Sequence, residues 1–130
     1  MLRRDLIEES LHYLMINVLV DKLEKDGFTV RADHVGGLRD RPESIEGYVP
    51  DIEAKRGAEV QLIEVETEST LDSEEAREQL AKLTSASRGK VYLAVPHDCL
   101  DRARGVRDDL KAGVVILPCY PFVRYVGTPK

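Results

Sequence analysis

The sequence has no apolar run that approaches the roughly 20 residues a helix needs to cross a bilayer. No secretory signal pattern is visible at its start, because residues 1–5 lead directly into a helical pattern. We therefore expect a cytoplasmic protein that has no membrane partner.

Cysteine is scarce, and the two cysteines, Cys99 and Cys119, lie far apart without a CxxC spacing. A structural zinc site needs about four ligands at short spacing, so a zinc centre is not expected. We expect both thiols to be reduced and to serve as small apolar residues.

The chain also lacks an excess of positive charge, since 19 Lys and Arg face 24 Asp and Glu for a formal net charge of −5. That balance argues against a protein that coats nucleic acid without specificity. Basic residues nevertheless gather in segments 31–41 and 102–111. Aspartates interleave with the second segment, so two interpretations stay open: patches that contact phosphates, or ordinary solvated surface charge.

Motifs for a phosphate-binding loop or an activated nucleophile are missing, which disfavours a small-molecule α/β enzyme. The composition is that of a globular protein, with 42% hydrophobic and 33% charged residues in a chain of 130. This length supports one real core, so residues 1–130 are predicted to form a single domain.

Hydrophobic periodicity and turn residues predict elements in the order α-β-β-β-α-β-α-β. Helices are expected at 3–26, 72–87 and about 99–111, and strands at 28–32, about 48–54, 59–67, 90–95 and 113–117, with a further edge strand at 122–126. Asp72 is the expected N-cap of the second helix. A hairpin-rich start followed by crossover helices predicts an α/β fold: a mixed central sheet with helices on both faces.

The first helix is apolar on two sides. One stripe consists of Ile7, Leu11, Leu14 and Val18, and the other of Tyr13, Ile16, Val20 and Leu23. Only one stripe can face the sheet, and a large exposed apolar patch is unusual for a monomer. A homodimer that covers the second stripe is therefore expected.

Carboxylates interrupt the apolar strand at 59–67. Glu64 and Glu66 share one face because side chains alternate along a strand, and Asp51 can reach that face from the neighbouring strand. Three converging carboxylates repel one another unless a hard divalent cation lies between them. A simpler interpretation also stays open, because alternating acidic and apolar residues are typical of a half-exposed strand.

The motifs Val49-Pro50-Asp51 and Glu64-Val65-Glu66, in this order of elements, resemble the restriction-endonuclease-like PD-(D/E)xK nuclease superfamily. The resemblance covers residues 1–96, and segment 22–30 is similar to the archaeal Holliday-junction resolvases. It implies that Asp51 and Glu64 bind Mg²⁺ or Mn²⁺, and that Glu66 binds a second ion or positions water.

The chain departs from that motif at Glu66, where the superfamily usually has a lysine. Lys55 or Lys82 could supply an ammonium group from a different position. The resolvases also carry an acid on the first helix, which maps onto Glu9; the competing interpretation is an acid favoured by the helix macrodipole.

The resemblance implies a metal-dependent endonuclease that hydrolyses phosphodiester bonds of DNA, works as a homodimer and acts through Asp51, Glu64, Glu66 and Glu9. Whether the DNA is branched stays open at this point. The alternative is a catalytically inactive relative that binds or scaffolds.

Overall fold

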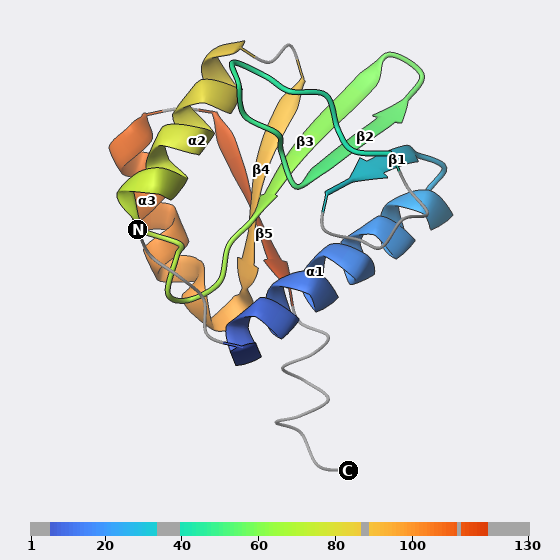
Figure 1. Ribbon diagram of the computed structural model, residues 1–130. Coiled ribbons are helices and arrows are strands. Elements are labelled where there is room, and N and C mark those ends of the chain that lie inside the picture. Colours follow the sequence, from blue (N-terminus) through green and yellow to red (C-terminus); the bar gives the residue numbers. More distant parts are fainter. Residues whose placement is uncertain (1–5, 34–39, 87–88, 112, 120–130) are drawn as a thin grey trace.

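A computed structural model describes residues 6–33, 40–86, 89–111 and 113–119, and Figure 1 shows an α/β architecture built on one sheet. The sheet has five strands in the order β1-β2-β3-β4-β5. Strand pairs β1–β2 and β2–β3 are antiparallel, whereas β3–β4 and β4–β5 are parallel. The strands are β1 (Thr29–Ala32), β2 (Ile52–Arg56), β3 (Glu59–Val65), β4 (Lys90–Pro96) and β5 (Val114–Cys119). The predicted α/β class and the mixed sheet are thus confirmed.

The three α-helices cover both faces of this sheet (Figure 1). They are α1 (Leu6–Lys25), α2 (Glu74–Ala86) and α3 (Leu100–Leu110), the last preceded by a short 3-10 turn, His97–Cys99. Side chains alternate along β3, so Ile63 and Val65 pack into the core beneath α1, while Leu62 packs into the core beneath α2 and α3. Two apolar cores result, one on each face of the sheet.

The β2–β3 hairpin has a fixed register. Ile52 pairs with Ile63 and Arg56 pairs with Glu59, around a turn in which Gly57 has a φ of 60°. Glycine adopts this left-handed conformation without the cost that a Cβ atom adds. Regular pairing begins at Ile52 rather than at residue 48 as predicted, because the preceding chain is tied to itself by a bridge between Ile45 and Tyr48.

The second helix begins one residue later than its predicted cap implied. The Ser73 hydroxyl, not Asp72, accepts a hydrogen bond from the Ala76 amide, at 3.1 Å. Asp72 instead forms an ion pair with Arg102 at 3.0 Å, so its carboxylate is turned toward α3. The apolar stripe predicted for this helix (Ala76, Leu80 and Leu83) is buried as expected.

One side of α1 faces the sheet and the other faces outward. Its buried residues are His12, Met15, Ile16, Val20 and Leu23. On the outward side Ile7, Leu14 and Val18 are 80%, 38% and 41% exposed. In the predicted stripe of Tyr13, Ile16, Val20 and Leu23, the exposed residue is Tyr13, at 37%. In the predicted stripe of Ile7, Leu11, Leu14 and Val18, Leu11 is partly buried.

Both cysteines are buried and reduced, as predicted. The edge strand expected at 122–126 lies outside the described residues. Within the part of the chain that is described, no helix is long and apolar enough to span a membrane.

Two glycines test the packing of this fold. A Cβ atom at Gly89 would lie 2.4 Å from the Val60 carbonyl oxygen, whereas one at Gly105 in α3 would meet nothing within 4 Å. We expect Gly89→Ala to destabilise the protein by about 1–3 kcal/mol through overpacking. Gly105→Ala should stabilise it by roughly 0.5–1 kcal/mol through helix propensity. Urea unfolding of both variants measures the difference, and equal effects would contradict the close approach at Gly89.

Candidate functional site

The hairpin register sets Asp51 against Glu64 at the end of β3. Ile52 pairs with Ile63 in the last regular pair of the ladder. Asp51 and Glu64 therefore lie opposite each other one position further along. The Asp51 amide donates a 3.3 Å hydrogen bond to Glu64 Oε2, and Asp51 Oδ2 accepts a 2.9 Å bond from the Val65 amide. Two carboxylates from neighbouring strands are therefore held together by the backbone itself.

These carboxylates line a pocket of about 390 Å³ between α1, α2 and the ends of β2 and β3. Its polar lining comes from four parts of the chain: His12 on α1, Asp33, Arg41, Tyr48 and Asp51 before β2, Glu64 and Glu66 at the end of β3, and Thr70, Ser73, Glu75 and Gln79 around the start of α2. Segments that are far apart in the sequence thus converge on one end of the sheet.

Glu64 is almost completely buried in the pocket. It is 1% exposed, and burial raises its pKa well above the ordinary value, with further increases from the charges of Asp51 and Glu66. Hydrogen bonds from Tyr48 and from the Asp51 amide act in the opposite direction. Burial and the neighbouring carboxylates also raise the pKa of Tyr48, so its hydroxyl stays protonated and acts as a donor.

Each carboxylate has its own partner, supplied by a different element. The Tyr48 hydroxyl donates to Glu64 Oε1 at 2.5 Å, and the Thr70 hydroxyl donates to Glu66 Oε1 at 2.7 Å. His12 Nε2 lies 3.5 Å from Asp51 Oδ2. Tyr48 and Thr70 bring no positive charge, so their hydrogen bonds orient the carboxylates without neutralising them.

Basic side chains contribute little to the pocket. Of the described residues that line it, Arg41 is the only lysine or arginine, and it is paired with Asp33 at 3.2 Å. Lys55 is half exposed with its Nζ 3.8 Å from Glu53, and neither Lys55 nor Lys82 lines the pocket among the described residues. The described lining thus holds no lysine in place of the one that Glu66 replaces.

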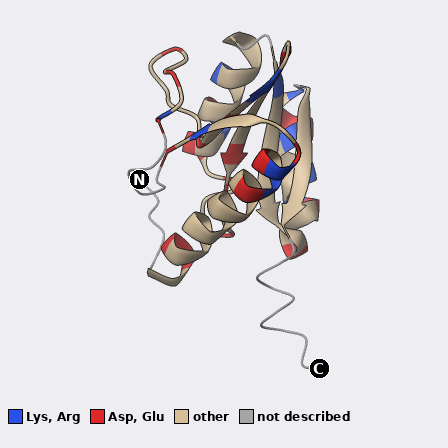
Figure 2. Cartoon of the chain, turned by 90° about the vertical axis from the view of Figure 1, so that its right-hand side faces the viewer, with Lys and Arg blue, Asp and Glu red and all other residues tan. Residues whose placement is uncertain are grey.

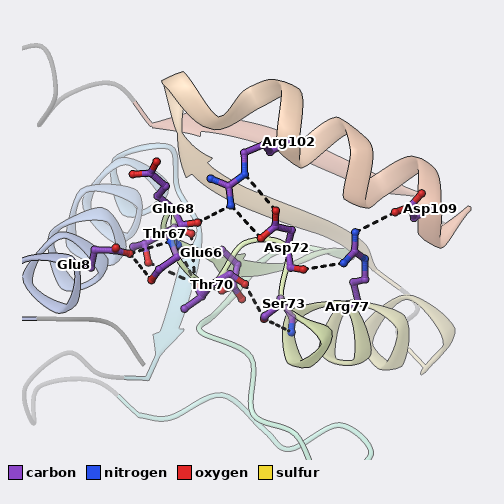
Figure 3. A network of polar contacts seen from close by, with 12 residues as sticks. Glu8, Glu66, Thr67, Glu68, Thr70, Asp72, Ser73, Arg77, Arg102 and Asp109 are labelled. Carbon is purple, nitrogen blue, oxygen red and sulfur yellow. Dashed lines mark hydrogen bonds and ion pairs between the residues drawn. The ribbon is translucent and has the colours of Figure 1, made fainter. Parts of the chain in front are cut away.

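The loop between β3 and α2 carries Glu66 and Thr70, and α1 anchors one side of it. Glu8 accepts hydrogen bonds from the Ser69 hydroxyl at 2.8 Å and from the Ser69 amide at 3.2 Å (Figure 3). These bonds fix the loop against the first helix, and the Thr70 hydroxyl then reaches Glu66.

The same loop is anchored on its other side by α3. Arg102 donates to the Glu68 carbonyl at 2.7 Å and to Asp72, and this pairing lowers the pKa of Asp72 (Figure 3). Arg77 at the start of α2 joins the Asp72 carbonyl to Asp109 of α3. The loop is therefore tied to three helices.

The basic segment predicted at 102–111 has a structural explanation. Arg102, Arg104 and Arg107 are paired with Asp72, Asp101 and Asp108, respectively. In the view of Figure 2 basic and acidic residues are interspersed over several elements. Of the two interpretations, surface charge accounts for these arginines.

Three of the four predicted site residues come together. Asp51, Glu64 and Glu66 line the pocket, as does Gln79, whereas Glu9 is not among its described lining residues. The neighbouring acid, Glu8, bonds Ser69 outside that lining. On α1 the residue that lines the pocket is His12.

Sequence reasoning missed His12, Tyr48 and Thr70. A signal existed for His12, since it lies one helical turn from Ile16 on the buried face of α1. Tyr48 was expected to be a strand residue, and nothing local to Thr70 predicts its bond to Glu66. Both depend on the folding of segments between regular elements.

The donor set suits a hard divalent cation such as Mg²⁺ or Mn²⁺, because three carboxylates supply only oxygen atoms. The carboxylates are, however, turned toward their own hydrogen-bond partners. Within the described residues, no group of three or more His, Cys, Asp or Glu side chains is arranged closely enough to hold a metal ion. An ion bound here would require these side chains to rotate.

No protein-family model, curated protein or solved structure matches this chain.

The buried carboxylates predict an unusual pH dependence for the metal-free protein. Because the pKa of Glu64 is raised in the folded state, the folded protein keeps a proton at pH values where the unfolded chain has lost it. The free energy of unfolding therefore falls as pH rises from the ordinary pKa of a glutamate toward the raised pKa of the folded state. Glu64→Gln should remove this slope and, at pH 8, stabilise the protein by on the order of 1 kcal/mol, since a buried repulsion disappears.

Chemical unfolding between pH 5 and 8 with a chelator present measures the slope. Glu59→Gln is the matched control, because hydrogen bonds from Gln61 and Arg56 lower the pKa of Glu59 and it titrates below this window. A wild-type protein whose stability does not fall with rising pH would contradict the buried repulsion.

Proposed function

We propose that this chain is a metal-dependent endonuclease that hydrolyses phosphodiester bonds of DNA, with a restriction-endonuclease-like arrangement of its core. The observation that carries the proposal is the pocket at the end of β3, where Asp51, Glu64 and Glu66 are buried together and the hydroxyls of Tyr48 and Thr70 orient two of the three carboxylates. Buried like charges are costly, and evolution retains them chiefly where they bind or react.

The chemistry follows from the donor set. A bound Mg²⁺ or Mn²⁺ would activate water and neutralise the charge that develops on a phosphate. Asp51 and Glu64 are the residues that would hold it, and Glu66 would hold a second ion or orient the water. His12 supports Asp51 from α1, and Thr70 supports Glu66 from the loop before α2.

Because the net charge is −5, DNA would have to be bound by individual basic residues placed near the pocket. Arg41 is suited to this role because it is 68% exposed at the pocket, next to the carboxylates. Its partner Asp33, held through one Nε–Oδ1 contact, could be exchanged for a phosphate, which a guanidinium can bind through two parallel hydrogen bonds. A structure-selective activity on branched DNA would fit a dimer that presents two such pockets.

A homodimer is the second part of the proposal. Leu14 and Val18 remain 38% and 41% exposed on α1, next to an apolar groove lined by Leu19, Tyr92 and Leu117. A two-fold contact through this side of α1 would cover both features.

The competing function is a non-catalytic protein that binds or scaffolds. The observation in its favour is the described lining, which lacks the lysine that this chemistry usually uses. Such a protein would keep the fold and lose turnover.

Metal binding and cleavage are tested together. Mn²⁺ at about 100 times its dissociation constant should stabilise the wild type by roughly 2.7 kcal/mol. Asp51→Asn should abolish this shift while keeping the fold, and Asp21→Asn, an exposed change on α1, should leave it intact. Incubation with linear, nicked and four-way-junction DNA, with and without Mn²⁺, measures cleavage.

The outcomes separate the two functions. Cleavage that needs Mn²⁺ and Asp51 supports the nuclease. Binding of Mn²⁺ without cleavage of any of these DNAs supports the non-catalytic protein. A normal Mn²⁺ shift in Asp51→Asn would remove Asp51 from the site.

The dimer is tested by light scattering. We expect the wild type to have twice the mass of one chain at micromolar concentration, and Val18→Asp to reduce it to a single chain by placing a charge in the apolar contact. Asn17→Asp, an equally charged change at the neighbouring exposed position, should have a smaller effect. A wild-type monomer would exclude the dimer.

A further inference from the structure

Tyr48 reaches the pocket from a short turn outside the sheet. Ile45 and Tyr48 exchange two backbone hydrogen bonds, at 2.7 and 2.9 Å, and the two residues between them have positive φ angles, 54° at Glu46 and 80° at Gly47. A tight turn with two such residues reverses the chain sharply. Glycine accepts this conformation readily, but glutamate rarely does.

A rarely used backbone conformation persists only where its surroundings hold it in place. Here the surroundings are the two ends of the turn. Ile45 and Tyr48 are partly buried and pack against the apolar core beneath α2 and α3. The tyrosine ring is thus fixed by packing, and its hydroxyl is directed at one atom, Glu64 Oε1.

The opposite oxygen of Glu64 is fixed independently. Glu64 Oε2 accepts the bond from the Asp51 amide, so one oxygen is held by a side chain and the other by the backbone. An ionised carboxylate has about four lone-pair sites, and two donors leave both oxygens able to accept further partners. A phenol occupies one site and adds no positive charge, whereas a lysine there would repel a cation.

We propose that Tyr48 is the positioning residue that fixes the carboxylate of Glu64 for a hard divalent cation. This inference rests on the proposed function, because it assumes that the pocket binds such an ion. Tyr48 need not touch the ion, since it acts through Glu64. Hydrogen-bond partners of metal-binding carboxylates typically affect metal affinity by about 10–100-fold when they are removed.

Tyr48→Phe removes the hydroxyl and keeps the ring. We expect its Mn²⁺ dissociation constant, measured by calorimetry well below the melting temperature, to rise by about 10–100-fold. Ser85→Ala is the control for loss of a hydroxyl, because Ser85 is exposed on α2, bonds the Lys82 carbonyl and is not among the described residues that line the pocket. It should bind Mn²⁺ like the wild type.

The outcomes distinguish a failure of the proposed function from a failure of the role assigned to Tyr48. If the wild type binds no Mn²⁺, the proposed function fails and this inference fails with it. If the wild type and Tyr48→Phe bind Mn²⁺ equally well, the inference alone is overturned, even where the variant melts earlier. Such a result would mean that Tyr48 only stabilises the turn.

A second measurement tests the inference on the wild type, in case Tyr48→Phe does not fold. Titration of the wild type with diamagnetic Mg²⁺ should shift the NMR signals of the Tyr48 ring and leave those of Tyr92 unchanged. Binding of Mg²⁺ with no response at Tyr48 would overturn the inference. Glu46→Asn, which suits a positive φ better, should keep the wild-type Mn²⁺ affinity because the hydroxyl is retained.

Discussion

The burial of Asp51 and Glu64 against each other is the constraint on which the rest of this structure depends. Desolvation disfavours the charge of Glu64, and the neighbouring charge of Asp51 adds repulsion. The chain meets this cost with hydrogen bonds to the backbone of the β2–β3 hairpin and with neutral hydroxyl donors. The proposed function depends on this pair of carboxylates.

The three helices surround this pair in distinct ways. α1 brings His12 to Asp51 and anchors the loop after β3 through Glu8. α3 holds the same loop from the other side through Arg102. α2 follows that loop, so the N-terminal end of a helix, with its partial positive charge, lies at the pocket edge. The loop that carries Glu66 is therefore held by contacts from all three of these helices.

Sequence patterns were sufficient for the regular elements and less so for what lies between them. The apolar stripe of α2 and the alternation of β3 could be read directly, because helix and strand periodicity are local properties. The cap of α2 was misassigned to Asp72, since the sequence does not reveal that Arg102, from another helix, is available to it. Glu9 was expected from the resemblance to the resolvases, but the rotation of α1 about its axis decides which of its residues lines the pocket, and only packing sets that rotation.

The sequence by itself determined the α/β class and the approach of Asp51, Glu64 and Glu66 to one another. These follow from periodicity and from the two-residue repeat of a strand. Tertiary structure alone decided that His12, Tyr48 and Thr70 meet those carboxylates and that the arginines of α3 are paired with aspartates. These contacts join residues distant in the chain, and their partners are fixed only when helices and loops pack on the sheet.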